Sequence, residues 1–105
     1  MMHRIGGFRI ADDHPSLPGH FPGRPVVPGV VLLDAAFALI LAQRPGRKVA
    51  GMPSVRFTRP VQSGQDVLVS CDHLSDSPGG GRIAFACTVE GQPVLHGSVT
   101  LGDPS

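Results

Sequence analysis

The sequence is poor in charge, and the few charges that it has are balanced. Of its 105 residues 16% are charged, and nine lysines and arginines against eight aspartates and glutamates give a formal net charge of +1. Proteins that bind nucleic acids usually carry a basic surplus, so we expect no nucleic-acid partner. For a single small domain, residues 1–105, so little charge indicates that part of the surface is covered by another copy of the chain.

Long hydrophobic runs are missing as well. The longest apolar stretch, residues 30–42, is interrupted by Asp34 and is shorter than the roughly 20 residues that cross a bilayer. The first seven residues lack the apolar core of a signal peptide. We therefore expect a cytoplasmic protein without a membrane partner. Cysteine is scarce too, and Cys71 and Cys87, which lack metal-ligand spacing, are most simply small core residues.

Proline and glycine, by contrast, are frequent and divide the chain into elements. Pro28 suits the first turn of a helix, and Pro45-Gly46 would end that helix near Gln43. Apolar side chains cover nearly every direction of this helix, and a helix that is apolar all round is expected to be buried all round. In so small a chain, a sheet wrapped around the helix is the arrangement that would bury it.

The remaining segments show the period-two alternation of strands that join in hairpins. Gly91-Gln92 is the expected turn between the last two strands. One long helix and one antiparallel sheet of about five strands predict an α+β architecture. The expected strands cover residues 3–10, 49–57, 67–72, 83–90 and 94–101.

One segment carries most of the chemical signal. His20 lies in a loop framed by prolines, and Asp34 is a lone carboxylate in an apolar helix. A histidine suits a general base, and a carboxyl group in apolar surroundings takes up a proton readily and suits a general acid. The helix start at Gly29 would present free N–H groups to a developing oxyanion. The alternatives are that Gly29 is only a flexible corner and that His20 is only a loop histidine bonded to backbone.

This segment reads His20-Phe21-Pro22-Gly23-Arg24-Pro25-Val26-Val27-Pro28-Gly29-Val30-Val31-Leu32-Leu33-Asp34-Ala35. It resembles the active-site segment of the hot-dog-fold 3-hydroxyacyl-[acyl-carrier-protein] dehydratases. Residues 55–61 resemble the family's segment after the central helix, and residues 83–101 its final hairpin. The resemblance implies a hot-dog fold that dimerises edge to edge, as a homodimer or a higher oligomer of dimers. Each active site would take the histidine from one subunit and the acid from the other.

The resemblance also implies the reaction and a role for each matching residue. His20 would remove the C2 proton of a 3-hydroxyacyl thioester on acyl carrier protein, and Asp34 would protonate the departing hydroxyl. The start of the helix, at Gly29 and Val30, would bind the thioester carbonyl. No cofactor and no metal are expected. The candidates for the acyl tunnel are Phe21, Leu33, Phe37 and Phe57, and those for a basic patch that binds the carrier are Arg24, Arg56 and Arg59.

Three departures from the family concern its substrates. Asp34 stands where the pure dehydratase branch has glutamate and the branch that also isomerises the product has aspartate. Ala38 replaces a common glutamine, and the chain has no tyrosine to gate a tunnel. Two other functions stay open, a hot-dog acyl thioesterase and a non-catalytic subunit that binds acyl chains or an active partner. A metal site made of Asp12, Asp13, His14 and His20 would match no familiar spacing.

Overall fold

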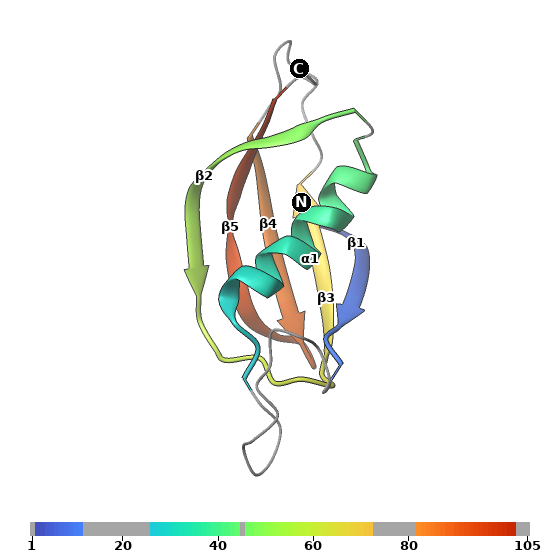
Figure 1. Cartoon of the computed structure of the whole chain (residues 1–105), viewed down its shortest axis with the longest axis vertical. Helices are drawn as coiled ribbons and strands as arrows, with labels where there is room; N and C mark the ends of the chain where they lie inside the picture. Colours follow the sequence, from blue (N-terminus) through green and yellow to red (C-terminus); the bar gives the residue numbers. More distant parts are fainter. Residues whose placement is uncertain (1, 12–25, 45, 73–81, 103–105) are drawn as a thin grey trace.

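The computed structural model describes residues 2–11, 26–44, 46–72 and 82–102. One helix lies diagonally across one face of a five-stranded antiparallel sheet (Figure 1). The strand order is β1-β3-β4-β5-β2, so that β1 and β2 form the two edges. The elements are β1 (Met2–Arg9), α1 (Gly29–Ala42), β2 (Lys48–Phe57), β3 (Asp66–Asp72), β4 (Arg82–Val89) and β5 (Gln92–Gly102).

The helix begins and ends where its flanking residues predict. Pro28 is the N-cap, with an extended backbone (φ −59°, ψ 143°). At the other end, the N–H of Gln43 donates to the carbonyl of Ile40 at 3.1 Å, and the N–H of Arg44 donates to that of Leu41 at 3.0 Å. Pro28 suits the start of the helix because proline is tolerated there without loss of a hydrogen bond. Beyond the end of the helix, Gly46 adopts a positive φ of 85°, which glycine does without strain. No helix in the described part of the chain has the length and apolarity needed to cross a membrane.

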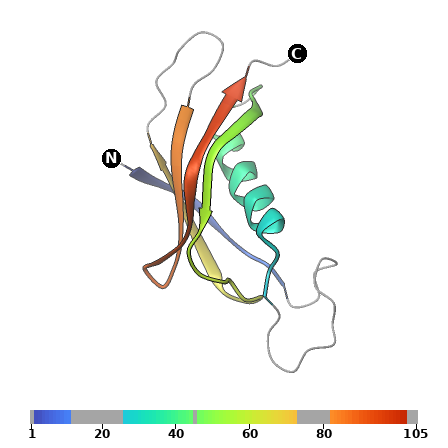
Figure 2. The same cartoon turned by 90° about the vertical axis from the view of Figure 1, so that its left-hand side faces the viewer.

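The helix is buried on one side only, which corrects the expectation of burial all round. The sheet covers a single face of α1 (Figure 2), because the five strands curve around it without closing. The buried residues of the helix are Leu32, Ala36, Phe37 and Ile40. The opposite side carries a stripe of exposed residues at four-residue spacing, namely Val30, Asp34, Ala38 and Ala42. Val30 alone leaves 65% of its surface exposed.

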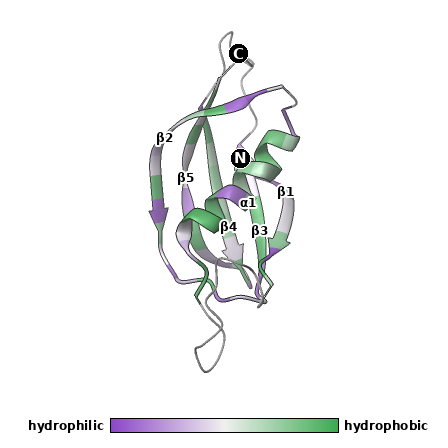
Figure 3. Ribbon diagram, in the orientation of Figure 1, coloured by the Kyte–Doolittle hydropathy of each residue, from purple (hydrophilic) through white to green (hydrophobic). Residues whose placement is uncertain are grey.

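The core lies between α1 and the inner face of the sheet (Figure 3, where the helix and the central strands are mostly green). Alternate residues of β3 and β4 point into it, as their period-two pattern predicts. Phe37 of the helix packs edge-on against Phe85 of β4, with ring centroids 5.6 Å apart and planes at 78°. Cys71 and Cys87 are both buried free thiols, so their interpretation as core residues is confirmed.

The hairpin between β4 and β5 turns one residue earlier than the sequence predicts. Val89 pairs with Gln92, so Glu90 and Gly91 are the two central residues. Both have positive φ, 51° and 78°, as a type I′ turn requires. The tight turn matches the twist of the two strands and sets the register of the sheet's longest strand.

Candidate active site

The start of α1 leaves backbone N–H groups without a capping side chain. Pro28 makes no side-chain cap, and the first turn contains no acidic residue. The N–H groups of Val31 and Leu32 donate to the Pro28 carbonyl at 3.0 and 3.3 Å. The N–H groups of Gly29 and Val30 come before these bonds, at the positive end of the helix dipole. This end of the helix therefore favours an oxyanion, as the residue pattern predicts.

Gly29 is in contact with the ring of Phe57, which lies 28 residues later in the sequence. A Cβ added to Gly29 would lie 2.7 Å from Cζ of Phe57 and 2.9 Å from Cε1, which is closer than carbon atoms approach. Gly29 has ordinary helical backbone and is not among the glycines with positive φ. The glycine therefore allows the close approach of Phe57, whose ring would have to move if position 29 carried a Cβ.

Backbone bonds on both sides hold these two residues together. Before the helix, the N–H of Val27 donates to the carbonyl of Val61 at 2.7 Å, and Val26 forms a bridge with Gln62. After β2, the N–H of Thr58 donates to the carbonyl of Val94 at 2.9 Å. The helix start and the end of β2 are thus tied to the same part of the fold.

An open pocket of about 420 Å³ lies where the helix start meets the end of β2. Its walls are mostly apolar, and Arg59 is the one charged residue among those that line it. The lining residues are Gly29, Leu32, Phe57, Thr58, Arg59, Pro60 and Val61.

The four candidate tunnel residues have different places. Phe57 lines this pocket and is 47% exposed. Phe37 is buried against Phe85, and Leu33 is half-buried against the core. Phe21 lies outside the described residues, as does His20.

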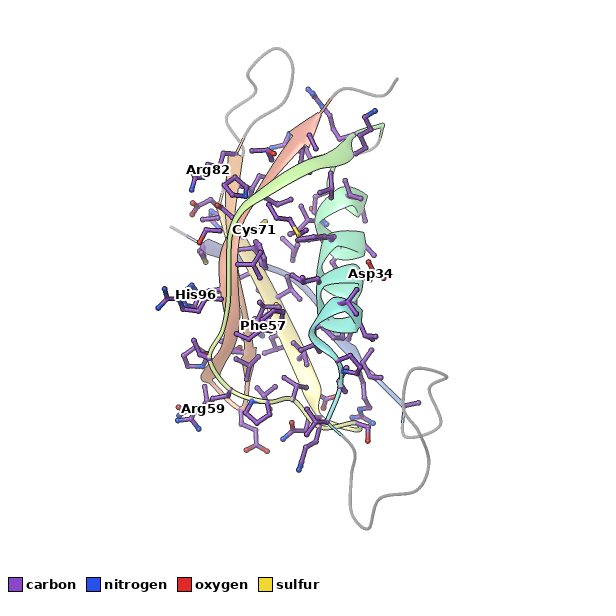
Figure 4. All side chains as sticks on the ribbon, turned by 60° about the vertical axis from the view of Figure 1, so that its left-hand side comes forward. Asp34, Phe57, Arg59, Cys71, Arg82 and His96 are labelled. Carbon is purple, nitrogen blue, oxygen red and sulfur yellow. The ribbon has the colours of Figure 1, made fainter. Side chains whose placement is uncertain are left out.

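Asp34 is exposed and points away from the sheet (Figure 4). The expectation of a carboxyl group buried in dry surroundings is therefore wrong for the single chain. Asp34 follows Gly29 by five residues, which places it about 7.5 Å further along the helix axis and roughly 140° around it. Within one chain, Gly29 and the candidate acid Asp34 therefore lie on different sides of the helix.

Two of the three predicted patch residues are described, and both are exposed. Arg59 lies beside the pocket, and Arg56 pairs with His96 across β2 and β5. His96 and Arg82 extend this basic surface along the side of the sheet away from α1 (Figure 4). Sequence reasoning missed His96 because strand pairing, not sequence distance, brings it beside Arg56. Arg82 lies further along β4, opposite Thr100. Arg24 lies outside the described residues.

A second pocket, of about 190 Å³, lies at the other end of α1. Burial, and to a smaller extent the charge of Asp72, raises the pKa of the Cys71 thiol in its wall, while Arg44 opposes the shift. Burial raises the pKa of Cys87, deeper in the core, to about 11. Both thiols are therefore neutral at physiological pH. The pocket is lined by His3, Ile5, Ile40, Gln43, Arg44, Cys71, Asp72 and Ile83.

Comparison with protein families gives one match that spans nearly the whole chain. Residues 3–98 match the ApeI-like family, which is described as ApeI dehydratase. The chain is also 34% identical over 101 residues to the 3-hydroxyacyl-[acyl-carrier-protein] dehydratase FabZ of Thermus thermophilus. That alignment covers 88% of this chain and 71% of the relative.

Solved structures share the fold at lower identity. One is the dehydratase heterocomplex ApeI:P of Xenorhabdus doucetiae, with a TM-score of 0.70 and 23% identity over 91% of this chain and 83% of the other. Another is a thioesterase of Thermus thermophilus in complex with coenzyme A and zinc, with a TM-score of 0.69 and 20% identity over 97% and 80%. The predicted hot-dog fold is confirmed. The fold alone does not separate a dehydratase from a thioesterase.

Proposed function

This chain belongs to the ApeI-like family of dehydratases, and on that basis we propose that it removes water from a (3R)-3-hydroxyacyl thioester on acyl carrier protein. The product is the trans-2-enoyl thioester, made for fatty-acid, polyene or polyketide type biosynthesis. The family match identifies the chain as a dehydratase, and the sequence relative named for this reaction on acyl carrier protein supports the substrate class.

The uncapped start of α1 is the observation that carries the proposed chemistry. Removing a proton beside a thioester places negative charge on the carbonyl oxygen, and stabilising that charge is the main catalytic task. The N–H groups of Gly29 and Val30 stand at a helix start with no side-chain cap and no acidic residue in the first turn. A carbonyl oxygen in the adjoining pocket would accept hydrogen bonds from them.

The proposed proton transfers use His20 and Asp34. His20 removes the C2 proton, and the electrons of that bond move toward the carbonyl oxygen as an enolate. The C2–C3 double bond then forms while the C3–O bond breaks, and the hydroxyl leaves as water with the proton of Asp34. His20 has gained one proton and Asp34 has lost one, so a proton transfer between them restores both groups.

The position of Asp34 supports a site shared between two chains. The carboxyl group lies on the open face of α1, away from the pocket at Gly29. A second copy whose sheet joins this one edge to edge, with its helix beside the open face of α1, would cover the exposed apolar Val30 and bring the partner's carboxyl group toward the pocket. We therefore propose a homodimer in which His20 and Gly29 act with the acid of the other subunit.

The basic surface suits an acidic carrier. Arg56 and Arg59 are exposed, and Arg59 lies at the pocket that would take the thioester. Opposite charge on the two proteins would speed their encounter and orient it. These two residues are the described members of the proposed carrier patch.

Two assays separate this proposal from its alternatives. With a 3-hydroxyacyl thioester the chain should produce the ultraviolet absorbance of an enoyl thioester and release no thiol. With a saturated acyl thioester it should do nothing, whereas a thioesterase would release free thiol. Formation of thiol without enoyl product would contradict the proposal, and so would inactivity toward both substrates.

A further inference from the structure

Phe57 has a position that its predicted role as one wall of a tunnel does not explain. It is the last residue of β2 and pairs with Leu95, yet its ring reaches the first residue of α1. Nearly half of its surface, 47%, stays exposed. A phenylalanine that served only the core would be expected to be buried, as Phe37 and Phe85 are.

The contact with Gly29 is close on several ring atoms. Cζ, Cε1 and Cε2 of Phe57 would all come within 3.2 Å of a Cβ at Gly29. Any side chain at position 29 would therefore have to push the ring away. The ring thus lies against Gly29, the first residue of the helix, and both residues line the same pocket.

We propose that Phe57 is a positioning residue, whose ring holds the thioester carbonyl against the N–H groups of Gly29 and Val30. This inference rests on the proposed function and goes beyond it, because it assigns the alignment of the carbonyl to one side chain. The ring narrows the pocket on the side facing β2 and keeps water from the uncapped N–H groups. A hydrogen bond to a developing charge is worth more where water is excluded.

The same inference explains why position 29 is a glycine. A helix start does not itself demand glycine, and the backbone at Gly29 has no positive φ. Only without a Cβ can the ring lie this close to the backbone. Gly29 and Phe57 therefore act as a pair, and a change at either residue should remove the same alignment.

The kinetic test compares Phe57→Ala with a matched control on the same strand. Phe57→Ala should lower kcat about 10- to 100-fold, the effect of misplacing a reacting group by about an ångström, with little change in KM. Phe57→Leu should recover part of the rate. Met52→Ala removes a side chain of β2 with similar exposure, 53%, that is not part of the pocket, and it should leave kcat unchanged.

A double variant tests the pairing. Gly29→Ala should lower kcat as Phe57→Ala does, because the new methyl group displaces the ring. If the two residues act as a unit, Gly29→Ala combined with Phe57→Ala should lose no more than the larger single loss. If the fold-loss of kcat in the double variant equals the product of the two single losses, the residues act separately and the pairing is overturned.

A binding measurement separates this inference from the proposed function. The glycine amides are labelled with nitrogen-15, and 3-hydroxydecanoyl N-acetylcysteamine thioester is the probe. In the wild type the probe should shift the Gly29 amide resonance, and in Phe57→Ala that shift should be lost. A Phe57-dependent shift without any dehydration would refute the proposed reaction and leave the positioning role standing. Dehydration with the same kcat and the same Gly29 shift in Phe57→Ala would overturn the positioning role, as would a wild type whose Gly29 amide does not respond.

Discussion

The two faces of α1 are built from similar apolar residues and have different tasks. On the sheet side, Leu32, Phe37 and Ile40 fill the core between helix and strands. On the open side, the exposed stripe runs from Val30 through Asp34 and Ala38. The sheet of the same chain covers the first face. The second face exposes apolar surface and the carboxyl group of Asp34.

This difference underlies our proposal that a second chain completes the active site. In the described part of the chain, one helix and one sheet bury a core and leave Asp34 exposed. A pocket closed on both sides then requires a second chain, which we propose is another copy packed on the open face. The buried face accordingly governs stability, whereas we propose that the open face governs assembly and proton transfer.

The largest expected effect concerns the acid on the open face. Asp34→Asn keeps the size of the side chain but has no proton to give to the departing hydroxyl, so turnover should fall about 10²- to 10⁴-fold. The melting temperature should stay close to that of the wild type, because Asp34 is exposed in the chain. Steady-state kinetics beside thermal unfolding tests both statements. Full activity in this variant would place the acid elsewhere.

The opposite result is expected on the buried face. Phe37→Ala removes a ring that packs edge-on against Phe85, so the free energy of unfolding should fall by about 3–5 kcal/mol. Chemical denaturation measures this loss, and Ala42→Ser on the exposed stripe serves as the control. An equal loss of stability in both variants would contradict the division between the two faces.

A change on the open face should act on assembly before it acts on folding. Ala38→Arg places a long cation in the exposed stripe, where a second copy would have to bury it. We expect at least about a tenfold weaker dimer, equivalent to about 1.4 kcal/mol, with the fold of each chain preserved. Sedimentation at several concentrations tests this, and Ala38→Ser is a control of nearly the same size. An unchanged association constant would mean that this face is not the interface.

Hydrophobic patterning predicts the elements of this fold closely. The helix and all five strands lie within two residues of their expected ends, because the period of the apolar residues changes clearly from one element to the next. The turn at Glu90-Gly91 differs by one residue from the prediction, since strand register decides which two residues take positive φ. The extent of burial of α1 was predicted wrongly, because a pattern shows that a face is apolar and not which chain covers it.

The site was predicted in part for a related reason. Gly29 stands at the start of the helix as its sequence context indicates. Its contact with the ring of Phe57, 28 positions later, could not be predicted in this way. Such a contact depends on where the end of β2 meets the helix, and no local pattern encodes that distance. The proton-transfer roles of His20 and Asp34 stay predictions.

The smallest expected effect is a pH dependence of the stability, which comes from Cys87 in the core under the buried face. Burial raises the pKa of Cys87 to about 11, from an ordinary value of 9.0. Between these two values the unfolded chain loses the thiol proton while the folded chain keeps it. Stability is therefore complete below about pH 9 and should fall by roughly 1–3 kcal/mol as the pH approaches 11.

Urea unfolding at pH 8 and at pH 10.5 measures this fall. Cys87→Ala should be less stable at both values and should show a smaller difference between them. An equal pH dependence in Cys87→Ala would assign the effect to other groups.

Complementation tests the central claim, that the open face of α1 supplies its acid to another chain. His20→Ala and Asp34→Asn are each expected to be inactive alone. When they are unfolded together in equal amounts and refolded, half of the dimers should be mixed, and each mixed dimer should contain one intact site. About a quarter of the wild-type activity per chain should return, as a two-fold symmetric dimer requires. A mixture as inactive as its two components, with mixed dimers shown to be present, would contradict the account.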